Sequence, residues 1–138
     1  FARKSKFNLI IPTLAIIVFV VHPIGRTVWY FALFWTIPII AYFIRDRFLL
    51  ARALGATFTA HAVGGALWVW IFALPAPIWI SLIPIVVLER SFFALGIAVS
   101  FVLVNNLLAF LEKKHILNLG FIINQRYLLG TLRHEPKT

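Results

Sequence analysis

Apolar residues occupy most of this chain in long runs, and charged residues fall between the runs. A helix that crosses a membrane needs about 20 apolar residues, within a range of roughly 17 to 25. Runs near that length, separated by charges, turns or prolines, predict an all-α fold, a polytopic transmembrane helix bundle. We expect four full spans, at residues 7–21, 28–44, 53–74 and 91–111.

Residues 75–88, between the third and fourth runs, are too short to cross. They hold about a dozen apolar residues before Glu89 and Arg90, which at 1.5 Å per residue fall short of a core about 30 Å thick. One helix over 77–111 would overshoot the bilayer and place both charges inside it, whereas a separate crossing would put the basic segment 112–115 outside. We therefore expect 75–88 to be a re-entrant or interfacial segment on the outer side.

Polar positions near the C-terminal end predict two further features. Residues 116–130 have apolar side chains at helical spacing, with amides elsewhere on the wheel, which predicts an amphipathic helix along the cytoplasmic interface. Asn105 and Asn106 lie in the cytoplasmic half of the last span, and neighbours on a helix point about 100° apart. We expect one amide to bond an adjacent helix and the other to approach the interface.

Composition supports a membrane environment. The chain has 138 residues, of which 62% are hydrophobic and 12% charged, and its mean hydropathy is +0.98. Soluble domains are about half apolar and a quarter charged. We therefore expect residues 1–138 to form a single integral membrane domain whose main partner is the lipid bilayer.

The chain has a net charge of +9, and the positions of its basic residues indicate which side of the membrane each loop occupies. A nucleic-acid binder would gather its charges on one soluble face, but here they are scattered between apolar runs, so we expect no nucleic acid partner. Basic residues crowd the N-terminal segment and residues 45–52, while the loop at 22–27 has only Arg26. Because cytoplasmic loops are enriched in lysine and arginine, we predict a multi-pass protein of the cell membrane with both termini cytoplasmic.

Several kinds of chemistry have no basis in the sequence. The chain contains no cysteine, which excludes disulfides, thiolate metal sites and cysteine nucleophiles. Three of its four histidines lie in loops or the tail, so we expect no metal and no cofactor. Motifs for phosphate binding, zinc proteolysis or a serine triad are absent, and we assign no catalytic residue.

The third span carries two rows of small residues. Ala56, Ala60 and Gly64 are spaced by four, which lets two helix backbones approach closely in lipid, so we assign this row to helix packing. In the neighbouring row stands His61, an ionisable group inside a span. Such a group is a functional-site hypothesis by default. It has two interpretations, a neutral imidazole that ties the bundle together or part of a binding cavity.

Glu89 and Arg90 are the second candidate feature, because Glu89 is an acid with apolar runs on both sides. On the predicted topology the two lie at the outer side, as do Trp68 and Trp79. One interpretation is an interfacial ion pair with an aromatic belt. The other is a polar mouth that holds a small ligand, for which the candidate ligand-binding residues are His61, Trp68, Trp79, Glu89 and Arg90.

The stretches "ALGATFTAHAVGGALWVW" and "LPAPIWISLIPIVVLERSFFALGIAVS" together resemble the substrate-binding membrane subunits, or S components, of energy-coupling-factor transporters. The resemblance covers residues 28–104. It is one of general composition, since these subunits are small, basic and rich in alanine- and glycine-containing spans. It implies a ligand pocket open to the outside and coupling to a partner membrane subunit with paired ATPases. These subunits usually have six spans, and no ligand residue is carried over from them.

Three functions follow from these observations. The first is a non-enzymatic subunit that binds a small solute for uptake. The second is an accessory or assembly subunit that docks other membrane subunits through the small-residue face. The third is a membrane-embedded enzyme acting on a lipid, with His61 or Glu89 transferring a proton. The predicted topology separates these two side chains in depth, which disfavours the third function.

Overall fold

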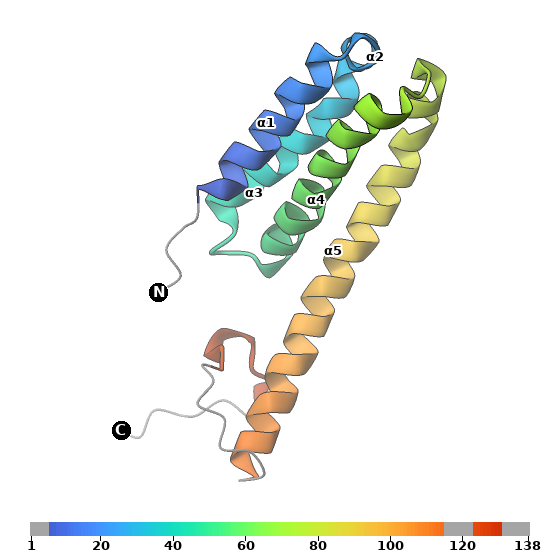
Figure 1. Ribbon diagram of the computed structural model, residues 1–138. Coiled ribbons are helices and arrows are strands. Elements are labelled where there is room, and N and C mark those ends of the chain that lie inside the picture. Colours follow the sequence, from blue (N-terminus) through green and yellow to red (C-terminus); the bar gives the residue numbers. More distant parts are fainter. Residues whose placement is uncertain (1–5, 115–122, 131–138) are drawn as a thin grey trace. The chain divides into compact units, whose positions relative to one another are not determined.

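Helices make up the secondary structure in the computed structural model, which describes residues 6–114 and 123–130 (Figure 1). The chain divides into two compact units, with the boundary between Leu95 and Gly96. The first unit contains five helices and the start of a sixth. In chain order they are α1 (Phe7–Val21), α2 (Pro23–Thr27), η1 (Trp29–Thr36), α3 (Ile37–Ile44), α4 (Leu49–Phe72) and α5 (Ala76–Lys113).

Local chemistry at His22 explains where α1 ends and α2 begins. His22 has extended backbone, and Pro23 follows it as the first residue of α2, where a missing N–H is tolerated. The His22 imidazole Nδ1 accepts a hydrogen bond from the Ile24 amide at 3.3 Å. Gly25 is buried against the Phe19 carbonyl, and a Cβ atom at residue 25 would collide with that backbone.

The second apolar run changes its helix type halfway. Its first half, η1, is a 3-10 helix, and its second half is the α-helix α3. Pro38 lacks the N–H that would bond the Phe34 carbonyl in an α-helix, and that carbonyl receives the Ile37 amide in the 3-10 pattern instead. Because a 3-10 helix rises about 2.0 Å per residue, Trp29–Ile44 reaches about 28 Å with 16 residues.

The core of the first unit is aromatic. Phe19 of α1 meets Trp35 of η1 edge to face at 5.0 Å between ring centroids, and Trp79 of α5 at 5.1 Å. Phe31 lies 5.0 Å from Trp79. All four are almost fully buried. Gly65 of α4 makes this packing possible, because the Trp35 ring occupies the space where its side chain would stand. These contacts fasten α1, η1, α4 and the first turns of α5 together.

The expected break between 75–88 and 91–111 is wrong, because α5 is one continuous helix of 38 residues. Its length is about 57 Å. The break was predicted because one helix over 77–111 would overshoot the bilayer and place Glu89 and Arg90 inside it. They form an ion pair with each other, and leucine, glutamate and arginine all favour helix, so nothing in that stretch stops the helix. Pro84 lies inside α5 without ending it.

Two helices are long and apolar enough to cross a membrane, α4 at about 36 Å and α5. Only 28% of the α4 window and 17% of the α5 window are buried, whereas the core helix of a soluble protein would be mostly buried. Their outward side chains include Val63, Leu67, Phe92 and Leu103, which are large, apolar and exposed. A hydrocarbon environment explains such surfaces. α1, at about 22 Å, is shorter than a bilayer core.

In the second unit, side chains of α5 bind the backbone of residues 123–130. The Asn105 amide donates to the Asn124 carbonyl at 3.1 Å, and its oxygen accepts from the Asn124 N–H at 2.9 Å. Asn106 donates to the Tyr127 carbonyl and accepts from the Leu129 N–H, both at 2.8 Å. Both amides therefore serve the same segment, contrary to the expectation that they would separate.

The predicted amphipathic helix at 116–130 is only partly open to comparison, because residues 115–122 lie outside the described part of the chain. Over 123–130 it is wrong, since that stretch contains the short 3-10 helix η2 (Gln125–Tyr127) between extended residues. Backbone groups that an α-helix would pair internally are taken by Asn105 and Asn106 instead. Asn124 also caps η2 with its own side chain, which accepts from the Arg126 N–H.

Candidate functional site

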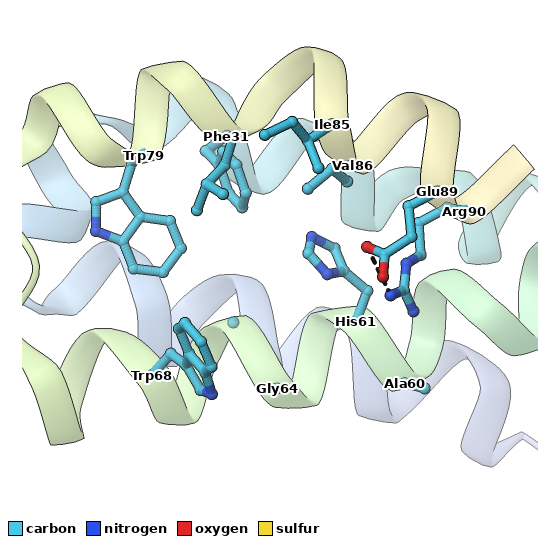
Figure 2. Close-up of a pocket in the computed structure, with 12 residues that line it drawn as sticks. Phe31, Ala60, His61, Gly64, Trp68, Trp79, Ile85, Val86, Glu89 and Arg90 are labelled. Atoms are coloured by element: carbon cyan, nitrogen blue, oxygen red, sulfur yellow. Dashed lines mark ion pairs between the residues drawn. The ribbon is translucent and has the colours of Figure 1, made fainter.

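A cavity of about 370 Å³ lies between α4 and α5 in the first unit, with η1 behind it. Figure 2 shows the residues that line it. Five of them are the residues proposed from the sequence as ligand-binding: His61, Trp68, Trp79, Glu89 and Arg90. The structure therefore brings together side chains that are up to 29 positions apart in the sequence (61 to 90). That they bind a ligand stays a prediction.

Helical spacing explains why these positions share one wall. On α4, His61, Gly64 and Trp68 recur every three or four residues, which places them on one face. On α5, Trp79, Val86 and Glu89 follow the same rule. The two helices are joined by a short turn at 73–75 and run antiparallel (Figure 1). Trp68 thus faces the first turns of α5, and His61 faces the stretch two to three turns further on.

The end of the cavity near the turn is aromatic. Trp79 is 2% exposed, and its indole N–H donates to the Leu74 carbonyl at 3.0 Å, which holds the ring in place. Phe31 of η1 packs against it. Trp68 differs because it is 51% exposed. This end therefore has one fixed wall and one aromatic side chain with room to adjust.

His61 lies about 10 Å further along α4, two helical turns from Trp68. Its ring contacts Phe31, Trp35 and Phe58, with centroids 5.8, 6.3 and 6.4 Å away. In Figure 2 the imidazole extends into the space beside Val86 and Glu89. Its Nε2 atom is buried and has no hydrogen-bond partner among the described residues. Such an atom costs about 1–3 kcal/mol.

Glu89 and Arg90 form the polar wall opposite His61. Arg90 Nη2 lies 2.9 Å from Glu89 Oε2, and the guanidinium carbon lies 4.9 Å from the centre of the Phe93 ring. The Arg90 side chain is 18% exposed and that of Glu89 is 45% exposed. Arg90 Nε is buried without a hydrogen-bond partner in the described part of the chain. Unsatisfied polar atoms thus gather at this end of the cavity.

Glu89 and Arg90 lie away from the end of α4 near which the sequence placed them. The predicted topology put them at the outer side, where the third span ends, and that end of α4 is marked by Trp70, whose ring centroid lies 4.9 Å from that of His22. Glu89 and Arg90 line the cavity with His61, in the middle of α4. The continuity of α5 is the cause, because an unbroken helix carries residue 89 about 20 Å along its axis from Ala76.

The two small-residue rows of α4 have different surroundings from those predicted. Ala56 and Ala60, assigned to helix packing, are exposed, and a Cβ atom on Gly64 would meet nothing within 4 Å. The buried row is the neighbouring one, which includes Thr57 and Gly65. Within this chain Ala60 and Gly64 line the cavity instead. Packing of Ala56, Ala60 and Gly64 against another subunit stays a prediction.

Sequence reasoning missed the apolar part of the lining, which consists of Phe31, Leu82, Ile85 and Val86. The helical spacing of Leu82 and Val86 from Trp79 would have indicated them, had residues 76–90 been predicted as helix. Phe31 belongs to a different apolar run, and nothing in the sequence around it indicated that it would line a cavity.

No group of three or more potential metal ligands occurs among the described residues. Comparisons with protein-family models, with curated proteins and with solved structures found no match. Function is therefore inferred from the cavity's own residues.

Proposed function

We propose that this protein is an integral membrane protein that binds a small solute between α4 and α5, as the solute-binding subunit of an uptake transporter. The observation that carries the proposal is the meeting of His61, Trp68, Trp79, Glu89 and Arg90 around one cavity. Small-molecule sites are typically apolar or aromatic clefts of roughly 300–1,000 Å³ with a few convergent polar groups. The cavity has each of these properties.

The energetics of the polar wall also favour binding over a purely structural role. Buried polar atoms in folded proteins nearly always have a partner, yet His61 Nε2 and Arg90 Nε have none among the described residues. A helix pair that served packing alone would gain stability from apolar residues at these positions. Exceptions to this rule gather at functional sites.

The separation of His61 and Glu89 that the sequence predicted argued against an enzymatic role, but both residues line the same cavity. Proton transfer still requires a group free to give or take the proton within hydrogen-bond reach. The Glu89 carboxylate is engaged by Arg90, which suits holding a ligand better than moving a proton. Solute binding is therefore the better-supported function.

We further propose that the chain crosses the membrane four times, with α1, the η1–α3 pair, α4 and α5 as its crossings and both termini cytoplasmic. The supporting observation is the charge of the loops, since Lys6 and Arg47 belong to one side of such a bundle and Arg26 to the other. The natural absence of cysteine makes this easy to test. Lys6→Cys and Arg47→Cys should react with an impermeant thiol reagent only in inverted vesicles, and Arg26→Cys only in intact cells. Labelling of all three from one side contradicts the topology.

The binding proposal is tested by filling the cavity. Gly64 lines the cavity and a Cβ atom there would meet nothing within 4 Å, so the side chain of Gly64→Leu begins in open space inside the cavity. Gly96→Leu is the matched control, because Gly96 also has nothing within 4 Å and does not line the cavity. Native mass spectrometry and thermal shift against a solute panel should show binding in the wild type and the Gly96 variant and none in the Gly64 variant. Equal behaviour of all three proteins contradicts the proposal.

The uptake role has its own test. Purification from native membrane in mild detergent should yield this protein together with a partner membrane subunit and ATPases. A protein that binds solute but purifies alone would contradict the uptake role and leave solute binding intact.

A further inference from the structure

The polar wall of the cavity presents a hydrogen-bond donor and an acceptor side by side. The Glu89–Arg90 contact uses Nη2 and Oε2. A guanidinium has five N–H donors and no acceptor, and a carboxylate accepts through two oxygens and donates nothing. A ligand group that fits this wall therefore carries one acceptor for Arg90 and one donor for Glu89. A carboxamide carries both, on an oxygen and a nitrogen bonded to the same carbon.

Charge balance excludes a charged ligand. Glu89 and Arg90 cancel each other, and no other acid, lysine or arginine among residues 6–114 and 123–130 lines the cavity. His61 is the thirteenth of the 24 residues of α4, so in a bilayer this wall lies near the midplane. A net charge there is costly unless it is paired. An anion would compete with Glu89 for Arg90, and a cation would compete with Arg90 for Glu89.

The aromatic end of the cavity, opposite the Glu89–Arg90 pair, fits a flat apolar part of a ligand. Phe31, Trp68 and Trp79 surround it, and Gly64 leaves open space between them and His61 (Figure 2). Aromatic rings stack or meet edge to face at centroid distances of about 4.5–7 Å. Phe31 connects the two ends, because its ring centroid lies 5.0 Å from that of Trp79 and 5.8 Å from that of His61. The aromatic end therefore adjoins the polar end, and one molecule reaches both.

We propose that the solute is an uncharged aromatic or heteroaromatic carboxamide, with its ring among Trp68, Trp79 and Phe31 and its amide on the Glu89–Arg90 pair. This assignment rests on the proposed solute-binding function and names the class of solute.

Three probes of the same shape separate charge from shape. Benzamide, benzoate and benzamidinium share one ring and differ as neutral, anionic and cationic. Binding to the purified protein is measured by quenching of tryptophan fluorescence and by saturation-transfer NMR. Benzamide should bind at least about tenfold more tightly than either ion, which is the size of one hydrogen bond to a charged group. It should also bind more tightly than cyclohexanecarboxamide, which lacks the flat ring.

Two variants should change which of the three probes binds most tightly. Arg90→Gln leaves the wall with a net negative charge, so benzamidinium should become the preferred probe. Glu89→Gln leaves it positive, so benzoate should become preferred. Because the Glu89 side chain is 45% exposed, its variant is expected to fold, and circular dichroism confirms this before titration.

The outcomes separate the two proposals. If an ion binds the wild type as tightly as benzamide, and Gly64→Leu abolishes that binding, the solute class is wrong and the cavity remains a binding site. If the preferences do not change in the Glu89 variant, the role of the pair is wrong. If all binding survives in Gly64→Leu, the cavity is not the site and both proposals fail.

Discussion

Gly64 and Gly65 are adjacent residues of α4, and the structure predicts opposite effects when each is replaced by alanine. Gly64 faces the cavity, where a Cβ atom meets nothing within 4 Å. Gly65 faces the core, where a Cβ atom would lie 2.5 Å from Cζ2 of Trp35. Trp35 is fully buried and is held by Phe19 and Phe31, so it has no free space to move into.

The magnitudes follow from two contributions. Replacing glycine by alanine inside a helix stabilises it by roughly 0.5–1 kcal/mol, and this contribution is common to both positions. Overpacking a filled core costs about 1–3 kcal/mol and applies to Gly65 alone. Gly64→Ala should therefore raise the free energy of unfolding by roughly 0.5–1 kcal/mol. The free energy of unfolding of Gly65→Ala should be about 1–3 kcal/mol lower than that of Gly64→Ala, because the gain in helix stability is the same in both variants and cancels in the difference.

Reversible unfolding in mixed micelles, followed by tryptophan fluorescence, measures both values. Trp35→Phe supplies the double-mutant cycle, since it removes the ring atoms that the new methyl group would strike. Gly65→Ala should be less harmful in the Trp35→Phe background than in the wild type. If the two glycine variants prove equally destabilising, Gly64 is packed and the cavity is not open at this position. That result would refute the placement of the cavity.

Three further predictions concern the turns and the second unit. Asn106→Leu removes the side-chain contacts to residues 127–129, so amide hydrogen exchange there should accelerate while exchange in the first unit is unchanged. Trp79→Phe loses the bond to the Leu74 carbonyl and leaves space where the larger indole ring was packed, so thermal unfolding should show a loss of about 1–3 kcal/mol; an unchanged stability would mean that the Trp79 ring and its bond do not secure the turn. Gly25→Ala forces a side chain into the backbone of α1 and should cost about 3 kcal/mol or more, visible as a lowered midpoint in the same assay.

The sequence by itself indicated an apolar environment and the local ends of several helices. Apolar runs and scattered charges indicate helices in an apolar medium, and the structure has two helices of sufficient length and composition. The predicted ends of the first and third runs, at residues 21 and 74, lie at or within two residues of the ends of α1 and α4. These properties depend on neighbouring residues alone, so they are readable from the chain. The candidate residues were found in the same way, because ionisable groups and tryptophans are conspicuous in an apolar sequence.

Tertiary structure alone decided which side chains meet. The sequence predicted a break near Glu89 because one helix over 77–111 would overshoot the bilayer and carry Glu89 and Arg90 into it, whereas α5 is continuous and the two residues form an ion pair. Once α5 is continuous, the antiparallel turn at 73–75 sets its register against α4 and brings Glu89 to His61. Likewise, one residue of helix rotation, about 100°, separates Gly64 in the cavity from Gly65 under Trp35. The register of α5 against α4 and the side of α4 that meets the core depend on contacts between distant segments, and the local pattern does not encode them.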